Sequence, residues 1–211
     1  MQRRELPPFV VQANFAMFSR PDTKADRVSY MFPTPGALRG LLQAIYHKRN
    51  KATGKMVEVT PVKVEVLNEI QMQPIPQLRR KGIVVQADKR PPQSTARTGS
   101  TYLYDVRYRL HYIVEGEQIL LDELETFIRT GAFYSAPYLG TRECLARIVP
   151  DEGAKPIRQT LVEAHMWLSN ARPMSGKPGD PNFAVQPVLM QSGVVTYPKF
   201  TGEILSQRRW G

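Results

Sequence analysis

The chain alternates between two hydrophobic periodicities, and each predicts a different kind of element. From Phe9 to Phe18 every second residue is apolar, which is the pattern of a half-buried strand. After Thr34, leucines and an isoleucine recur at i, i+3, i+4 and i+7, which predicts an amphipathic helix from Pro35 to about Lys48. A threonine cap followed by proline at the first helical position favours this start.

The same two periods continue to about Pro150. They predict four further elements, in the order strand, strand, helix and strand, at residues 57–66, 102–114, 120–130 and 145–149. Gly131 is the residue type favoured just after a helix end. The complete order of strand, helix, strand, strand, helix, strand is that of the split βαβ unit. We therefore expect an α+β protein with a ferredoxin-like βαββαβ core over residues 1–150.

Two segments lie outside the expected core. A proline-rich, basic stretch over about residues 74–101 separates the second and third strands, and a connection of that length in a compact domain is typical of a functional insertion. Residues 151–211 read as a small, β-rich C-terminal extension. Within it we expect one helical patch near Leu161–Leu168 and a strand at Val194–Tyr197.

Charge and cysteine content narrow the function. The chain has 29 Lys and Arg against 19 Asp and Glu, a net charge of +10, which favours a polyanionic partner such as nucleic acid. A generally basic protein is the alternative. The single cysteine, Cys144, excludes an internal disulfide and a cysteine-rich zinc site, and suits a reducing cytoplasm. No signal peptide and no run of 18 apolar residues is present, so we expect neither secretion by that route nor a membrane span.

Several motifs together resemble one known family. They are Phe18–Pro21 with Asp26–Tyr30, Pro33–Tyr46, Tyr104–Tyr108, Tyr138–Cys144 and, more weakly, Met190–Val195. In this combination and order they resemble the CRISPR-associated RAMP proteins of the Cas-five family, most closely its subtype I-C (Dvulg) branch.

The resemblance implies a function in antiviral defence. Such proteins cap the 5′ handle of the guide RNA (crRNA) in a multi-subunit surveillance complex, Cascade, beside its backbone and large subunits. Target DNA within the complex is a further candidate partner, and no cofactor or metal is implied. In the I-C branch they also resemble the enzyme that cuts the precursor (pre-crRNA) without a metal. The insertion at about 74–101 resembles in position the thumb that such subunits wedge between guide nucleotides.

Metal-free RNA cleavage needs a base, an acid and a cation close to one phosphate. The resemblance places a catalytic aromatic at Tyr46, for which ordinary packing of a helix tyrosine is the alternative. The family's second catalytic element is a Lys-His pair before the second helix, and this chain has Gln118–Leu121 there instead. The cleavage site is therefore incomplete by comparison with the family.

The remaining catalytic candidates are His47, Lys48 and His111. Successive helical residues point about 100° apart, so Tyr46, His47 and Lys48 cannot all face one phosphate on an intact helix. His111 lies on the third strand and is expected near the end of the first helix, or else is a structural histidine or phosphate contact. Two hypotheses follow: a processing endoribonuclease that stays bound to its product, and a purely structural crRNA cap.

The candidate RNA-binding residues are cations, together with one turn. Arginines interleaved with tyrosines on the third strand suit single-stranded RNA, because guanidinium groups clamp phosphates while rings stack on bases. Gly140, Thr141 and Arg142 combine a close backbone approach, a hydroxyl and a guanidinium into a phosphate cradle, with a simple turn as the alternative. For the insertion, the alternative is a solvated charge run. The full set is Arg20, Lys24, Arg27, Arg39, Arg79, Arg80, Lys81, Lys89, Arg90, Arg107, Arg109, Gly140, Thr141 and Arg142.

Overall fold

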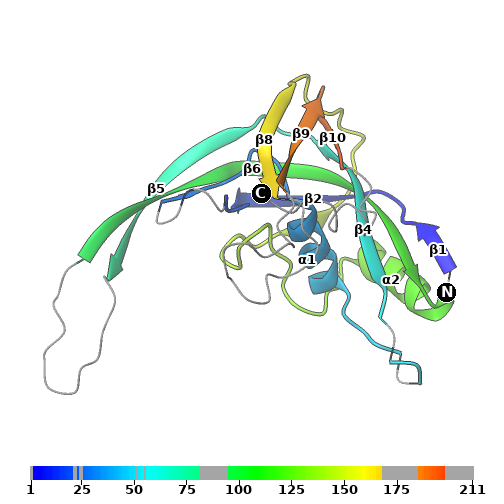
Figure 1. Ribbon diagram of the computed structural model, residues 1–211. Helices are drawn as coiled ribbons and strands as arrows, with labels where there is room; N and C mark the ends of the chain where they lie inside the picture. The colour runs from blue at the N-terminus through cyan, green and yellow to red at the C-terminus, as the bar shows by residue number, and fades with distance from the viewer. Residues whose placement is uncertain are drawn as a thin grey trace, which may run out of the picture.

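The computed structural model describes residues 2–20, 23, 26–50, 52–54, 56–80, 95–167 and 185–197. Over these residues the chain forms one large, mostly antiparallel sheet and two α-helices (Figure 1). The elements are β1 (Gln2–Glu5), β2 (Phe9–Ala16), β3 (Arg27–Val28), α1 (Pro35–Ile45), β4 (Glu58–Val66), β5 (Gln71–Arg80), β6 (Thr95–Gly116), α2 (Gln118–Thr130), β7 (Arg147–Val149), β8 (Leu161–Trp167), β9 (Val185–Gln191) and β10 (Val194–Thr196).

The expected core elements are all present and in the expected order, as β2, α1, β4, β6, α2 and β7. The sheet order is β7-β2-β6-β4-β10-β9-β8, so β6 lies between β2 and β4 and pairs antiparallel with both. Both helices lie below the long strands in Figure 1. Side chains from α1, α2 and these strands form one hydrophobic core. The α+β prediction is confirmed at this level.

Local signals set the helix ends. The Thr34 hydroxyl accepts a hydrogen bond from the Ala37 N–H at 3.2 Å, and Pro35 opens α1. The helix stops at Ile45 and not near Lys48, because Tyr46 is already extended, with φ −139° and ψ 115°. Gly131 ends α2 in the left-handed conformation that glycine tolerates. In the described part of the chain, no helix combines the length and apolar character that crossing a membrane requires.

The insertion forms an arm. β5 pairs antiparallel with the first half of β6, from Gln71 opposite Tyr104 to Arg80 opposite Thr95. We call β5 together with Thr95–Tyr104 the arm, and Figure 1 shows it extending away from the helices. The prolines that suggested a loop, Pro74 and Pro76, are two residues apart, so both lack an N–H on the same edge of β5, the edge turned away from β6. They leave the pairing intact and block further strand addition.

A kink separates the arm from the core. Asp105 has a positive φ of 48°, which few non-glycine residues adopt. The Asn68 amide donates to the Asp105 carbonyl at 2.9 Å and to its carboxylate at 3.1 Å. Tyr104 and Asp105 are both exposed, whereas Leu103 and Val106 on either side are buried, so the inside-outside alternation shifts here. The kink therefore lets one strand belong to both the core and the arm.

The C-terminal extension adds strands to the same sheet through pairing of β10 with β4. The helical patch expected near Leu161–Leu168 is wrong, because Leu161–Trp167 forms strand β8, paired with β9. A register shift between Glu163 and Met166 interrupts the two-residue alternation, which made the segment resemble a helix. The strand expected at Val194–Tyr197 is confirmed as β10, one residue shorter.

The turn at Tyr138–Leu145 packs against the backbone just after the end of β2. The Met17 N–H donates to the Leu139 carbonyl at 3.1 Å. Gly140 has a φ of 89°, and a Cβ there would lie 1.9 Å from the Met17 carbonyl oxygen. Only glycine fits, and the backbone approach at Gly140 is made to the protein's own chain.

We expect Gly140→Ala to lower the free energy of unfolding by about 3 kcal/mol or more, because it adds a backbone clash to left-handed strain. Gly131→Ala is the matched control, since Gly131 has a φ of 69° but no atom within 4 Å of the added Cβ, and should cost only about 1 kcal/mol. Urea denaturation of both variants checks this. Equal losses would show that the contact with Met17 does not constrain the turn.

Candidate functional site

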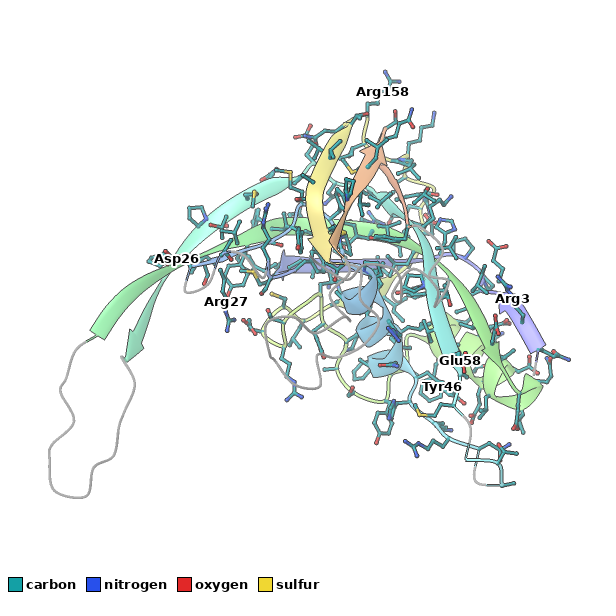
Figure 2. The ribbon with its side chains drawn as sticks, in the orientation of Figure 1. Arg3, Asp26, Arg27, Tyr46, Glu58 and Arg158 are labelled. Carbon is teal, nitrogen blue, oxygen red and sulfur yellow. The ribbon has the colours of Figure 1, made fainter. Side chains whose placement is uncertain are left out.

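The residues after α1 form a compact polar cluster with α2. Tyr46 is 5% exposed, and its hydroxyl donates to Glu123 Oε2 at 2.7 Å. Lys48 Nζ donates to the other oxygen of Glu123 at 2.6 Å. The Phe127 ring packs edge-on against Tyr46, with centroids 5.4 Å apart. Figure 2 shows Tyr46 at the end of α1, on the side of α2. The carboxylate therefore bridges a phenol and an ammonium group.

Proton affinities in this cluster are shifted in opposite directions. Burial, and then the hydrogen bond to Glu123, raise the pKa of Tyr46 well above its ordinary value. Hydrogen bonds from Lys48 and Tyr46 lower the pKa of Glu123. At neutral pH the cluster thus holds a neutral phenol, an ionised carboxylate and a cation. These are a proton donor, a proton acceptor and a charge stabiliser within hydrogen-bonding distance of one another.

His47 lies apart from this cluster. The chain is extended at Tyr46, so alternate side chains point to opposite sides and the helical spacing no longer applies. The structure brings Tyr46 and Lys48 together on Glu123, while the His47 ring lies 5.8 Å from the ring of Tyr134. Of the three neighbours considered for catalysis, two share a partner and the third does not.

His111 is on the other face of the sheet. Its neighbours Leu110 and Tyr112 are buried, and the Tyr112 hydroxyl donates to the Leu38 carbonyl of α1 at 2.9 Å. Side chains alternate along a strand, so His111 points away from α1. It contacts Glu65 at 3.0 Å instead, and burial together with nearby Lys63 lowers its pKa. The expectation that His111 approaches the end of the first helix is wrong.

Arg109 and Arg107 hold the loop after β7. Arg109 donates to both carboxylate oxygens of Asp151 at 2.6 Å, and also to Glu65 at 2.5 Å. Arg107 contacts the Pro150 carbonyl at 3.3 Å. The bond from Arg109 lowers the pKa of Asp151 to about 2. These guanidinium groups are engaged by the protein itself, which favours a structural role over phosphate binding.

Other candidate cations gather at the base of the arm. Arg27 in β3 pairs with Ser100 of β6, and its side chain lies 3.6 Å from Glu143 of the Tyr138–Leu145 turn. The preceding residue, Asp26, accepts a hydrogen bond from the Gly99 N–H at 2.9 Å. Figure 2 labels Asp26 and Arg27 where the arm leaves the sheet. Arg142, in the same turn, is exposed. Glu143 therefore contacts Arg27 and directly follows the exposed Arg142 in the chain.

The remaining candidates are less grouped. Arg20 stacks over Tyr30 at 5.4 Å and lies 3.5 Å from Glu163, while burial lowers the pKa of Arg39 in α1. Thr141 Oγ1 contacts Cys144 Sγ at 3.5 Å. The others are outside what the structure describes: all of Lys24, Lys81, Lys89 and Arg90, and the side chains of Arg79 and Arg80.

Sequence reasoning missed three residues. The first is Glu123, whose position four residues before Phe127 is the one sequence feature that links it to the packed face of α2. The other two are Phe133 and Tyr134, which are exposed shortly after the glycine that ends α2.

Among the residues that the structure describes, no group of three or more His, Cys, Asp or Glu side chains is placed to hold a metal.

The fold resembles that of solved CRISPR-associated proteins. A solved "CRISPR-associated Protein" aligns with a TM-score of 0.62 at 22% identity, covering 94% of this chain and 95% of that one. A chain from a "CRISPR RNA-guided surveillance complex" aligns with a TM-score of 0.52 at 16% identity, covering 90% and 91%. At these identities the alignments establish shared architecture.

The sequence gives the family. Residues 9–169 match the Cas5d model of the family described as CRISPR-associated protein (Cas_Cas5). The chain therefore belongs to the Cas5 family, in its Cas5d branch.

Two relatives are named "CRISPR pre-crRNA endoribonuclease Cas5d". The one from Thermus thermophilus is 32% identical over 165 residues, 69% of this chain but only 64% of the relative's length. The one from Mannheimia succiniciproducens is 25% identical over 168 residues, covering 71% and 75%.

We expect Arg109→Met to destabilise the fold by about 2 kcal/mol at neutral pH, because Asp151 and Glu65 lose a charged donor. Asp151 has a depressed pKa, so its contribution is complete above its ordinary value of 3.8 and is lost as the pH falls toward about 2. The difference between variant and parent should therefore shrink over that interval in urea titrations.

The control is Arg3→Met, because Arg3 and Glu115 form an exposed ion pair at 3.6 Å, which contributes little. A pH-independent effect of Arg109→Met would contradict the assigned pairing.

Proposed function

We propose that the chain is the crRNA-binding subunit of a type I-C-like Cascade and holds the 5′ handle of the guide RNA in antiviral defence. The observation that carries the proposal is its membership of the Cas5d branch over residues 9–169, joined to a net charge of +10. Its partners are crRNA and pre-crRNA, the backbone and large subunits of the complex, and target DNA held there. We propose a cytoplasmic location, which the single free, buried Cys144 suits.

We further infer that the core is ferredoxin-like. The order β7-β2-β6-β4 with antiparallel neighbours, and one helix following each of β2 and β6, supports this inference. In this proposal residues 1–150 form the RAMP domain, residues 74–101 the thumb, and residues 151–211 the extension. The thumb overlaps the arm, and its sequence contains Arg79, Arg80, Lys81, Lys89 and Arg90.

The RNA-binding surface that we propose runs along the base of the arm. Arg27 and Glu143 form a long, partly exposed pair, which is weak in water and leaves Arg27 available to a phosphate. Arg142 is exposed beside it. Arg107 and Arg109, whose guanidinium groups already meet carboxylates and carbonyls, fit this function poorly. The proposed phosphate contacts therefore lie on the side of the arm base and of the Tyr138–Leu145 turn.

We expect the full chain to bind a labelled repeat hairpin carrying the 5′ handle with strong salt dependence, measured by fluorescence anisotropy between about 50 and 200 mM salt. Arg27→Gln should weaken binding and reduce the salt slope by about 1, because one phosphate contact is lost. Arg3→Gln is the control, since Figure 2 shows Arg3 at the opposite end of the sheet from Arg27. Absence of salt-sensitive binding would refute the proposed function, and equal effects of both variants would refute the proposed surface.

Cleavage of pre-crRNA is a second candidate function, favoured by the bridge from Tyr46 through Glu123 to Lys48. In this mechanism Glu123 accepts the proton of a 2′-hydroxyl, whose oxygen attacks the adjacent phosphorus. Lys48 stabilises the phosphorane charge, and Tyr46 donates a proton to the departing 5′-oxygen. The products are a 2′,3′-cyclic phosphate and a 5′-hydroxyl. Glu123 supplies the base in a chain that lacks the family's Lys-His pair.

With EDTA present, we expect the full chain to cut the repeat hairpin, and expect Glu123→Gln and Tyr46→Phe each to slow cleavage by about 10²- to 10⁴-fold. Glu115→Gln is the control, because Glu115 is an exposed carboxylate on β6 that is paired with Arg3. Gel electrophoresis of the products gives the rates, and circular dichroism checks folding. A hairpin that stays tightly bound and uncut would instead identify a structural crRNA cap.

A further inference from the structure

Two consecutive aromatic residues that follow α2 have exposed side chains. Phe133 is 54% exposed and Tyr134 is 66% exposed, and they lie two and three residues after Gly131, the glycine that ends α2. The His47 ring lies 5.8 Å from the Tyr134 ring, with the planes inclined at 41°. The cluster of Tyr46, Glu123 and Lys48 uses none of these three rings. We call Phe133, Tyr134 and His47 the aromatic platform.

The backbone of the platform is fixed. The Tyr134 N–H donates to the Ile45 carbonyl at 2.9 Å, and the Ser135 N–H donates to the Ala44 carbonyl at 2.9 Å. These bonds satisfy two of the carbonyl groups left without a helical partner at the end of α1. The rings therefore lie on an ordered segment. A ligand that stacks on them loses little binding free energy to ordering of the backbone.

The charge around the aromatic platform favours contact with the base of a nucleotide over contact with its phosphate. The C-terminal end of a helix carries partial negative charge, so a phosphate is disfavoured directly at the end of α1. A neutral base is not disfavoured, and a base stacks well on tyrosine or phenylalanine. Arg49 is exposed two residues after His47, where it can reach a neighbouring phosphate. Glu123 is turned to the opposite side, toward Tyr46 and Lys48.

We propose that Tyr134, flanked by Phe133 and His47, is a stacking site for one base of a single-stranded RNA segment. The inference rests on the proposed RNA-binding function and adds a ligand class and a contact residue to it. His47 directly follows Tyr46, so the stacked nucleotide lies next to the segment that contacts Glu123. Protein-docking surfaces are normally far larger than two rings and an imidazole, and the size of the platform favours a base over a partner subunit.

The test compares two single-stranded 12-nucleotide RNAs, an oligoadenylate and an abasic RNA of the same length. Tyr134→Ala in the full chain should weaken oligoadenylate binding about 5- to 150-fold, because one stacking contact is lost. It should leave abasic RNA binding and the salt slope unchanged, because no phosphate contact is lost. Tyr134→Phe should bind like the parent, and Val162→Ala, which changes a comparably exposed apolar side chain on β8, should have no effect. Tyr134→Trp adds a reporter whose fluorescence the RNA should quench.

Two results would overturn the stacking site while leaving RNA binding standing. The first is that Tyr134→Ala binds oligoadenylate as tightly as the parent does. This holds also if that variant fails to assemble with its partner subunits, because the rings would then serve protein docking. The other is an equal loss on the abasic RNA, which would indicate altered folding or charge. If the parent chain binds neither RNA in a salt-dependent way, the proposed function itself fails.

Discussion

The structure depends on one long strand, β6, with which five other strands pair. Its 22 residues pair with β2 and β4 in the core, with β5 along the arm and with β1 and β3 at other points. A strand that serves a packed core and a projecting arm must change which side chains face inward, and the left-handed residue Asp105 makes that change. The Asn68 amide holds the kink from the neighbouring chain segment. The irregularity lies where the half of β6 that pairs with β5 meets the half that pairs with β4.

Along β6, the arginines that bind other parts of the protein lie apart from the arginines that we propose for RNA. Beyond the kink, Arg107 and Arg109 bind the loop at 150–154, so basic residues that resemble a phosphate-binding stripe in the sequence instead close the sheet face opposite α1. Before the kink, the base of the arm carries Arg27 beside the turn that contains Arg142. The ends of the helices add the bridge from Tyr46 to Glu123 and the aromatic platform. The features that we propose for RNA are therefore at the arm base and the helix ends.

Periodicity predicted the core elements well, because burial on one face imposes its period directly on the sequence. Thr34 and Gly131 marked helix ends correctly for the same local reason. Features that depend on pairing between distant segments were not readable. The register shift made β8 resemble a helix, and Pro74 and Pro76 suggested a loop where they protect an edge. The partners of Arg109 and Glu123 are 42 and 77 residues away, so spacing alone could not reveal them.

RNA is expected to meet this sheet at the arm base and the helix ends, and not on the face that Arg109 closes. Ultraviolet cross-linking of the full chain to its repeat RNA, followed by mass spectrometry of the cross-linked peptides, tests this directly. We predict cross-links in peptides that contain Arg27, the Tyr138–Leu145 turn and residues 133–134, with none around Arg109 and Asp151. Cross-links concentrated on the Arg109 face would contradict this placement, as would their absence from the arm base.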